Sequence, residues 1–313
     1  PLCVSRHRLE MALRTYVTNE DLRVLCAMEL EGDTYQDEPI TSFIDSTIQI
    51  AISRVFTLTQ LDVFGFPAIG QQYIYCMETS DVQHPYLHVK APPASDVDWR
   101  VLHDGARLLL EKYRQQILEH GRIMISTDEH TSDAFEALIT IVFKGKMKRI
   151  MNSNCGMFYM TNDQRENLLA MEIPVPAGFR IESVNADKDG DTIYSLWKNA
   201  ISREVTIERL RCFPSICVRD SAGELVGWAM TGRFGQISNE FVMPEHRGKG
   251  LGRAVELALA KELIRKGRRV FKYVDIANEA VYESSSRSTK WTLWREEDGK
   301  RKPLYFRKFE IVS

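Results

Sequence analysis

The sequence lacks the features that would place it among membrane, secreted or nucleic-acid-binding proteins. No apolar run approaches the roughly 20 residues that a helix needs to cross a bilayer, so we expect no membrane partner. The first nineteen residues contain no apolar core of the secretory type, which leaves a trimmed organelle-targeting segment or ordinary surface residues as alternatives. With 41 basic and 43 acidic residues the formal net charge is −2. No overall positive field therefore attracts nucleic acid.

Cysteine is scarce and scattered, and the sequence contains no nucleophile elbow of the Gly-x-Ser-x-Gly type. The six cysteines form no Cys-x-x-Cys pair: Cys3, Cys26, Cys76, Cys155, Cys212 and Cys217. This spacing favours buried reduced thiols in an intracellular protein, cytoplasmic or mitochondrial, over a disulfide framework or a zinc site. His84 and His88 are four residues apart, but Pro85 between them argues against a helical metal-binding pair. We expect no metal.

What the sequence contains is typical of a globular α/β chain of 313 residues, 44% hydrophobic and 27% charged. That length suits two domains. Two prolines and a glycine break all periodicity over residues 173–178, which predicts an N-terminal α/β domain over 1–172 and a second domain over 173–313. Alternating strands and helices in both halves indicate an α/β class.

The hydrophobic periodicity and the turn residues predict the following elements. In the first half these are a helix over 104–120 ended by Gly121, a strand over 122–125, a helix capped by Ser132 or Asp133 and running to Val142, a basic loop over 144–149, a strand over 156–160 and a helix over 163–170. In the second half they are strands over 179–184, 215–219, 224–231, 236–243, 270–276, 291–295 and 304–312, and helices over 191–200, 202–211, 251–266 and 278–288.

The stretch from Gly235 to Arg253 carries the chemical signal. A strand stopped by Pro244 leads through a glycine-rich turn into a helix whose apolar face repeats every four residues from Leu251. Such a turn presents free backbone N–H groups and the positive end of a helix dipole to an anion. Three glycines let a ligand approach the backbone and three basic residues add charge: Gly248, Gly250 and Gly252, with Arg247, Lys249 and Arg253. We expect a polyanionic ligand.

The glycine spacing excludes two nucleotide-binding motifs. Neither Gly-x-Gly-x-x-Gly nor the phosphate loop Gly-x-x-x-x-Gly-Lys-[Ser/Thr] fits. Arg-x-x-Gly-x-Gly does fit at Arg247, Gly250 and Gly252, preceded by Val-x-Pro at 242–244. This pattern resembles the acyl-CoA-binding motif of the GCN5-related N-acyltransferase (GNAT) superfamily. A tight strand-to-helix turn with incidental glycines is the alternative, and the order β-α-α-β-β-β-α-β-α-β-β after residue 173 argues against it.

The resemblance extends to the glycine N-acyltransferase-like family. It rests on segments at the expected distances from one another: 213–218 with Gly227 and Trp228, 243–247 and 274–280. It implies a GNAT fold (α/β, or α+β in some schemes), a mixed twisted sheet flanked by helices, and a second, degenerate GNAT-like domain at the N-terminus. It also implies acetyl-CoA or another acyl-CoA as co-substrate and a small amine or amino acid as acceptor.

Site residues follow from the same resemblance. The backbone of Phe241, Val242 and Met243 would contact the thioester and pantetheine. The CoA pyrophosphate would lie on the turn, with Arg247, Gly248, Lys249, Gly250, Leu251, Gly252 and Arg253 around it, and Asn278 would also contact CoA. In relatives a catalytic Glu stands where this chain has Gln236, and a proton-donating Tyr stands where it has Ser285.

Two other residues could take over proton transfer. Glu240 lies four residues beyond Gln236, which predicts the same face of the strand, and a carboxylate in an apolar strand suggests either a raised pKa for proton abstraction or an ion pair with a nearby arginine. Tyr282, about one helical turn from Ser285, could protonate the thiolate. Gln236 itself could orient an amine or water but cannot act as a base. Catalysis without any residue acting as base is a further alternative.

These observations predict an acyl-CoA-dependent N-acyltransferase in which the amine attacks the bound thioester directly, with glycine or another small amino acid as acceptor. One alternative is a protein or polyamine N-acetyltransferase. The other is an acyl-CoA-binding module without turnover, because both positions that relatives use for proton transfer differ here.

Overall fold

The computed structural model describes residues 12–31, 56–67, 72–91, 98–296 and 298–312. The chain forms two compact units, and both are discontinuous in sequence. Unit 1 comprises residues 1–28, 59–155 and 302–313, and unit 2 comprises residues 29–58 and 156–301. The expected domain boundary at 172/173 therefore falls inside unit 2. Cys3 lies outside the described residues, and so does the side chain of Cys26.

Unit 1 contains a β-sheet with helices packed against it. Its strands are β1 (Arg14–Tyr16), β2 (Gln60–Phe66), β3 (Tyr73–Thr79), β4 (Tyr86–Lys90), β5 (Arg122–Thr127) and β13 (Pro303–Ile311), in the order β1-β2-β3-β4-β5-β13. Neighbours are antiparallel except for the parallel pair β4 and β5. Helices α2 (Asn19–Glu31), α4 (Trp99–Lys112), α5 (Arg114–His120) and α6 (Glu129–Val142) complete the unit. Its core joins Phe64 and Tyr75 of the sheet to Leu109 and Phe135 of α4 and α6.

Three expectations for this region are wrong in detail. The helix expected over 104–120 starts at Trp99, capped by the side chain of Asp98, and is interrupted at Tyr113. The cap of α6 is Asp128, which accepts a hydrogen bond from Thr131 N at 2.9 Å, and not Ser132 or Asp133. Strand β6 (Met147–Tyr159) is much longer than the expected strand over 156–160, so Lys148 and Arg149 lie on a strand and not in a basic loop.

Most elements of unit 2 agree with those expected from the sequence, but the helix expected over 191–200 spans Ala186–Leu196. Its strands are β7 (Arg180–Ser183), β8 (Ser215–Arg219), β9 (Leu225–Thr231), β10 (Ile237–Val242) and β11 (Phe271–Asp275), with β12 (Thr292–Leu293) pairing with the end of β6. The order from the end of β6 is β6-β11-β10-β9-β8-β7. Its helices are α7 (Asn162–Ala170), α8 (Ala186–Leu196), α9 (Arg203–Cys212), the 3-10 helix η2 (Pro244–His246), α10 (Leu251–Arg265) and α11 (Glu279–Arg287).

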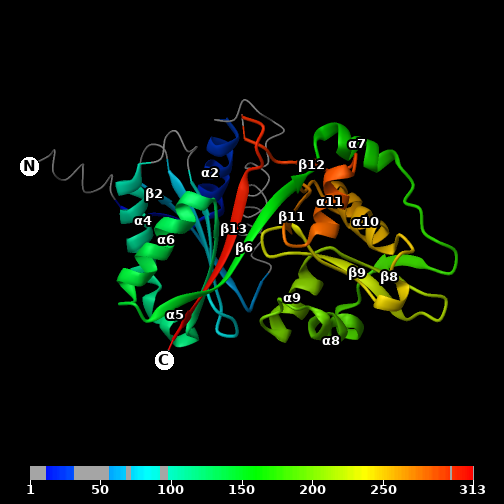
Figure 1. The fold of residues 1–313 in the computed structure, drawn as a ribbon, viewed down its shortest axis with the longest axis horizontal. Helices are drawn as coiled ribbons and strands as arrows, with labels where there is room; N and C mark the ends of the chain where they lie inside the picture. The colour runs from blue at the N-terminus through cyan, green and yellow to red at the C-terminus, as the bar shows by residue number, and fades with distance from the viewer. Residues whose placement is uncertain (1–11, 32–55, 68–71, 92–97, 297, 313) are drawn as a thin grey trace, which may run out of the picture. The chain divides into compact units, whose positions relative to one another are not determined.

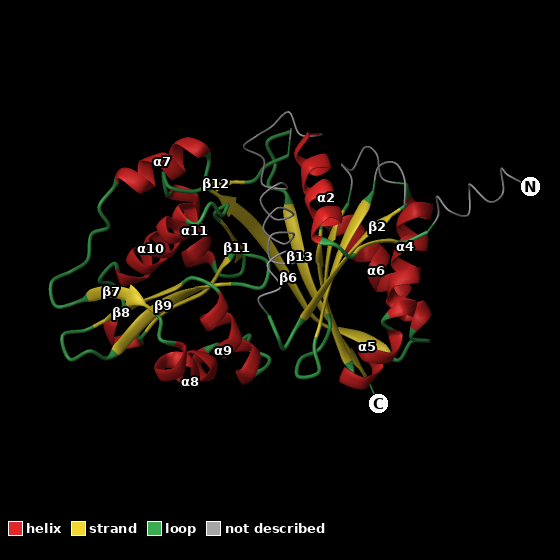
Figure 2. Ribbon diagram, turned by 180° about the vertical axis from the view of Figure 1, so that it is seen from behind, coloured by secondary structure: helices red, strands yellow, loops and turns green. Residues whose placement is uncertain are grey.

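Helices cover both faces of the sheet in unit 2. Figure 1 shows α10 and α11 on one side of β8 and β9, and α8 and α9 on the other; the reverse view in Figure 2 agrees. Leu251, Val255 and Leu259 of α10 pack against the first face. On the second face Trp228 is fully buried, and its ring stacks on that of Phe241 with the centroids 4.8 Å apart. The strand β10 is thus held between two apolar layers.

An early segment of the chain belongs to unit 2. The Thr57 and Leu58 amides donate hydrogen bonds to Glu208 Oε1 on α9, at 2.6 and 3.0 Å. The ring of Phe56 meets that of Phe213 edge to face, 4.9 Å between centroids. These contacts link residues about 150 positions apart in sequence, which sequence periodicity cannot reveal.

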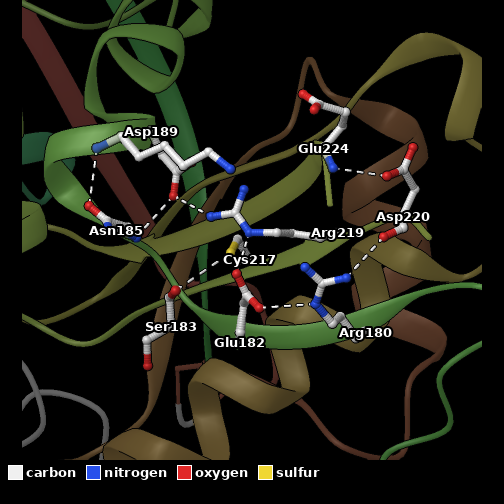
Figure 3. Close-up of polar contacts among 10 residues, drawn as sticks. Arg180, Glu182, Ser183, Asn185, Asp189, Cys217, Arg219, Asp220 and Glu224 are labelled. Carbon is white, nitrogen blue, oxygen red and sulfur yellow. Dashed lines mark hydrogen bonds and ion pairs between the residues drawn. The ribbon is translucent and has the colours of Figure 1, made fainter. Parts of the chain in front are cut away.

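A buried arginine ties the start of α8 to the edge of the sheet. Figure 3 shows the Arg219 guanidinium between the carboxylates of Glu182 and Asp189, and its Nη2 lies 2.7 Å from Asp189 Oδ2. Asp189 also accepts a hydrogen bond from Asn185 N at 2.9 Å. Arg219 is 3% exposed and Asp189 2%, so removing Arg219 would leave the Asp189 carboxylate buried without its cation, which is strongly destabilising.

The described residues contain neither a membrane-spanning helix nor a cluster of metal ligands. No helix among them is long and apolar enough to span a membrane. Within the same ranges no group of three or more His, Cys, Asp or Glu side chains is placed to hold a metal ion. The four cysteines whose side chains are described form no disulfide bond: Cys76, Cys155, Cys212 and Cys217.

Candidate acyl-CoA site

Strand β10 separates from one of its two neighbours. Its ladder with β9 runs from Ile237 to Val242, whereas its parallel ladder with β11 contains the single pair Ile237 and Lys272. Beyond Ile237, the strand pairs with another strand on one edge only, within the part of the chain that the structure describes. An open strand edge offers N–H and C=O groups to an extended ligand.

A β-bulge interrupts β10. Between Ser238 and Phe241 the strand carries one residue more than β9 opposite, and Asn239 adopts a left-handed conformation with φ of 46°. The extra residue reverses the alternation of side chains. Glu240 therefore lies on the α10 side, together with Ile237 and Val242. The expectation that Glu240 shares a face with Gln236 is wrong for this reason.

The peptide groups at the end of β10 point in alternate directions. Met243 N donates to Val226 O of the β9 region at 2.9 Å, and Phe241 O faces β9 so closely that a Cβ on Gly227 would lie 3.0 Å from it. Val242 O points the other way and accepts from Arg247 Nε at 3.0 Å. Because the N–H and C=O of one strand residue share a direction, the Val242 N–H faces the open edge.

The turn after β10 builds an uncapped helix start. Gly248 and Gly250 have φ of 76° and 78°, and nothing lies within 4 Å of a Cβ at either position. Gly250 is the N-cap of α10 and no side chain caps the helix. The first intrahelical bond of α10 that reaches back to the cap is Ala254 N to Gly250 O, 3.1 Å. The N–H groups of residues 251–253 thus point out of the helix end, as an anion site requires.

Basic side chains surround this turn. Arg247 stands over the Phe241 ring, 5.6 Å from its centroid, so that one guanidinium connects the turn to the end of β10. Lys249 Nζ lies 5.6 Å from the Phe179 centroid and 3.3 Å from Glu245 O. Arg253 is exposed in the first turn of α10. The positive charge and the helix dipole act on the same space.

Gly252 serves a different purpose from the other two glycines. It lies within α10, and a Cβ there would come 2.7 Å from Glu240 Oε1 and 3.6 Å from Val242 Cγ2. The missing Cβ thus makes room for the Glu240 carboxyl group beneath the helix. The motif in the sequence suggests a different role for Gly252, which is to let a ligand approach the backbone from outside.

The Glu240 carboxyl group turns inward although the residue as a whole is exposed. Burial of the carboxyl group, followed by repulsion from Glu256, raises the pKa of Glu240 from 4.5 to about 8, and Lys272 opposes this rise. The alternative of an ion pair with a nearby arginine finds no support, because the charges that act on the group belong to Glu256 and Lys272.

Gln236 is occupied in a turn. Its Oε1 accepts a hydrogen bond from Phe234 N at 3.0 Å, and its side chain covers Gly232, where a Cβ would lie 2.5 Å from Gln236 Cδ. Its own carbonyl accepts from Gly232 N at 2.7 Å. The side chain therefore closes the β9–β10 turn.

Helix α11 carries the three remaining candidates. Asn278 is its N-cap and makes no side-chain cap bond, while Ser285 is buried, 4% exposed. Tyr282 packs on the last part of β6: its ring lies 5.4 Å from that of Phe158, and a Cβ on Gly156 would lie 2.8 Å from its Cε2. These contacts place Tyr282 against β6, the strand beyond β11.

Three residues near Glu240 were not anticipated. Glu256, Lys272 and Trp291 are all at most 7% exposed. Glu256 lies one helical turn after Gly252 on the apolar stripe of α10, and Lys272 interrupts the apolar strand β11. Charged residues on faces that periodicity assigns to the core are the signal that could have revealed them.

Comparisons with known proteins agree with this geometry. The family model described as "FR47-like protein" matches residues 216–284. An X-ray structure of a Drosophila protein matches with a TM-score of 0.72 and 14% identity, covering 96% of this chain and 98% of that one. A tandem GNAT protein from the clavulanic acid biosynthesis pathway has a TM-score of 0.55 and 15% identity, covering 96% and 99%. A GCN5-related N-acetyltransferase from Kribbella flavida has a TM-score of 0.50 and 11% identity, covering 87% and 96%.

At these identities the structures establish the fold. The expected GNAT fold is confirmed, and a tandem arrangement of it matches nearly the whole chain. The family model and these folds together support the GNAT superfamily. The narrower resemblance to glycine N-acyltransferases stays a prediction.

Proposed function

We propose that the protein is an acyl-CoA-dependent N-acyltransferase that acts on a small amine, such as glycine or another amino acid. The observation that carries this proposal is the pairing of two features at one end of β10. The strand has an open edge there, and it runs directly into an uncapped helix start ringed by Arg247, Lys249 and Arg253. A long ligand with an anionic group at one end and an extended arm fits both.

Each part of the site would bind a different part of the co-substrate. The N–H groups of Leu251, Gly252 and Arg253 would hold the pyrophosphate, and Gly248 and Gly250 would let it approach the backbone. Val242, whose peptide faces the open edge, would donate its N–H to the pantetheine arm or the thioester carbonyl. Met243, whose N–H is already bonded to Val226 O, and Phe241 would act mainly through their side chains.

Glu240 is the group best placed to accept a proton from the acceptor. An acceptor ammonium must lose one proton before its nitrogen can attack, and a carboxylate with pKa near the working pH is an effective base. The amine nitrogen then forms a bond to the thioester carbonyl carbon and loses a second proton. The C–S bond breaks, the thiolate leaves with the electron pair and takes up one proton. The net products are an amide, CoA thiol and one released proton.

A binding module without turnover is the second candidate. Two observations favour it: Gln236 is engaged in a turn, and Ser285 is buried where relatives have a proton-donating tyrosine. Tyr282 packs against Phe158 and would need access to the thiolate to replace that group. A protein or polyamine acceptor in place of an amino acid remains the alternative within the enzyme class.

The test measures CoA release from acetyl-CoA, a longer aliphatic acyl-CoA and benzoyl-CoA against amino acids and polyamines, with thermal-shift binding of each thioester. We expect amine-dependent release that falls by about 10²–10⁴-fold in Glu240→Gln, the range for loss of a general base, with thioester binding retained. Glu262→Gln changes a partly exposed glutamate of α10 that pairs with Lys266 at 3.5 Å; it is the matched control and should behave as wild type.

The other outcomes decide between the candidates. Thioester binding without release for any amine would establish the binding module. Release that survives Glu240→Gln would remove Glu240 from the mechanism. Replacing Gln236 with Glu should change turnover little, because the Gln236 side chain is held against Phe234 and Gly232; a large gain would instead indicate a degenerate site.

A further inference from the structure

A charged cluster lies in the core of unit 2, directly behind the open edge of β10. Glu256 of α10 and Lys272 of β11 form a salt bridge with both side chains less than 10% exposed. Trp291, 5% exposed, donates its Nε1–H to Glu256 Oε2 at 3.2 Å. The Lys272 ammonium also stands 4.6 Å from the centroid of the Trp291 ring. Every charge in this trio is thus paired.

This trio fixes the Glu256 carboxylate in place. One of its oxygens faces Lys272 and the other faces Trp291, so both are occupied. Glu256 therefore presents a fixed negative charge that cannot rotate away from its neighbours.

The charge of Glu256 acts on the neighbouring carboxyl group of Glu240. Its carboxyl group enters beneath α10 at Gly252, one helical turn before Glu256 on the same face. The charged groups that act on it are Glu256 from α10 and Lys272 from β11. The third packed element, β9, contributes no ionisable side chain, since its sequence is Leu-Val-Gly-Trp-Ala-Met-Thr.

We propose that Glu256, held by Lys272 and Trp291, is a positioning residue that acts through Glu240 and makes it a proton acceptor suited to an ammonium group. The inference rests on the proposed acyltransferase function for its role in catalysis. Its physical part, the effect of Glu256 on the proton of Glu240, concerns the resting protein alone. The proton moves from the acceptor nitrogen to a Glu240 oxygen, and Glu256 itself exchanges none.

The order of effects supports this assignment. Burial makes the largest contribution to the raised pKa of Glu240 and the charge of Glu256 makes the next largest, while Lys272 lowers this pKa. Like charges in one buried site disfavour double ionisation. Without Glu256 the unpaired Lys272 would stabilise ionised Glu240, which would then become a weaker base. Without Lys272 the two carboxylates would compete for one proton.

The experiment uses two readouts so that its failure can be separated from failure of the proposed function. The first is the ¹³C NMR titration of carboxyl groups in glutamate-labelled full-length protein, with the Glu240 signal assigned by its loss in Glu240→Gln. The second is the pH profile of kcat/KM. In wild type we expect Glu240 to titrate well above other glutamates. In Glu256→Gln its midpoint should fall by at least one pH unit, a tenfold change in proton affinity, and the acidic limb of the profile should move with it.

Glu262→Gln is the control for both readouts and should shift neither. An ordinary Glu240 midpoint in wild type would overturn the proposal without any variant, which matters because removing one partner of a buried pair can prevent folding. An unmoved midpoint in folded Glu256→Gln would overturn it too. A shifted Glu240 midpoint without amine-dependent turnover would support the electrostatic effect of Glu256 and contradict the acyltransferase function. Turnover whose pH profile does not move with the Glu240 midpoint would exclude Glu240 as the base.

Discussion

Replacement of Gly252 by alanine should separate stability from turnover. The new Cβ would lie 2.7 Å from Glu240 Oε1, and ordinary contact begins at 3.4 Å, so the carboxyl group must retreat by at least 0.7 Å. The atom that must move is the far end of a flexible side chain, and Val242 Cγ2, at 3.6 Å, need not move. Alanine also favours the helix by about 0.5–1 kcal/mol over glycine. We therefore expect a free energy of unfolding that is unchanged or slightly raised.

Turnover should fall nonetheless. A misplacement of about 1 Å can cost roughly 10²-fold in rate, so a shift of at least 0.7 Å predicts a loss of about tenfold or more in kcat. Acyl-CoA binding should persist, because the added methyl group points inward, towards Glu240. The measurements are urea unfolding, thioester binding and amine-dependent CoA release. In a Glu240→Gln background the same substitution should reduce kcat no further, since coupled residues are non-additive.

Two results for Gly252→Ala would contradict this prediction: turnover equal to that of wild type, or a loss of turnover only in proportion to a loss of stability. The first result would mean that Glu240 takes no part in the reaction. The second would mean that the carboxyl group cannot retreat and that the helix itself is displaced.

Three further predictions concern the turn, the buried arginine and pH. Gly250→Ala, at φ of 78°, should cost about 1–2 kcal/mol of left-handed strain and weaken acyl-CoA binding in calorimetry, whereas Gly145→Ala, at φ of 72° in unit 1, should cost similar stability and leave binding intact. Arg219→Met should lower the free energy of unfolding by about 3–5 kcal/mol in urea, against at most about 0.5 kcal/mol for the exposed Arg180→Met; equal effects would contradict the buried network. Because the pKa of Glu240 is raised from 4.5 to about 8, the folded protein binds more protons than the unfolded chain between these values, so its stability falls as pH rises across that window. Glu240→Gln cannot titrate at this position, so its stability relative to that of wild type should rise as pH increases to about 8. Stability curves that stay parallel would contradict this prediction.

The sequence predicts unit 2 well because its elements are local. The strand before Pro244, the glycine turn and the helix from Leu251 to Gly267 depend on residues close to one another, and Gly267, at φ of 69°, does end α10. The motif residues around the turn could therefore be named in advance. The order of these elements resembles that of the GNAT fold, which the structural comparisons confirm.

Long-range pairing could not be predicted in the same way. Strand β13, at the end of the chain, pairs with β5 of unit 1, at Arg307 opposite Ile125. Gly299 lies between the strands expected over 291–295 and 304–312, as the turn of a hairpin would, and the chain does reverse there at the bridge between Arg295 and Arg301. The strands on either side do not continue as a hairpin: β12 pairs with the end of β6, whereas β13 lies between β5 and β6. A turn residue specifies the reversal of the chain but not the partner of the next strand.

The bulge at Asn239 is the detail that decided the site. Regular alternation of side chains along a strand predicts that Glu240 and Gln236 lie on the same face. The one extra residue of the bulge places Glu240 on the other face. Asparagine is among the few residues that tolerate a left-handed conformation, yet Asn239 alone does not reveal a bulge, because asparagine also occurs in regular strands. The reversal depends on the register with β9, which is a property of two strands together.

The charges beneath α10 are costly, and that cost itself argues for a role in chemistry. A buried ion pair can often be replaced by apolar residues of similar volume without loss of stability, and a second carboxyl group beside it raises the cost further. Glu240, Glu256 and Lys272 nevertheless meet in a helix–sheet interface otherwise filled by residues such as Leu251 and Val255. The contacts of Glu256 with Lys272 and Trp291 stabilise that pair. Among the described residues Glu240 has no cation of its own, and it lies where β10 has separated from β11. A carboxyl group placed in this way gains little for folding, and the function that its placement suits is to take up and release a proton at the open edge.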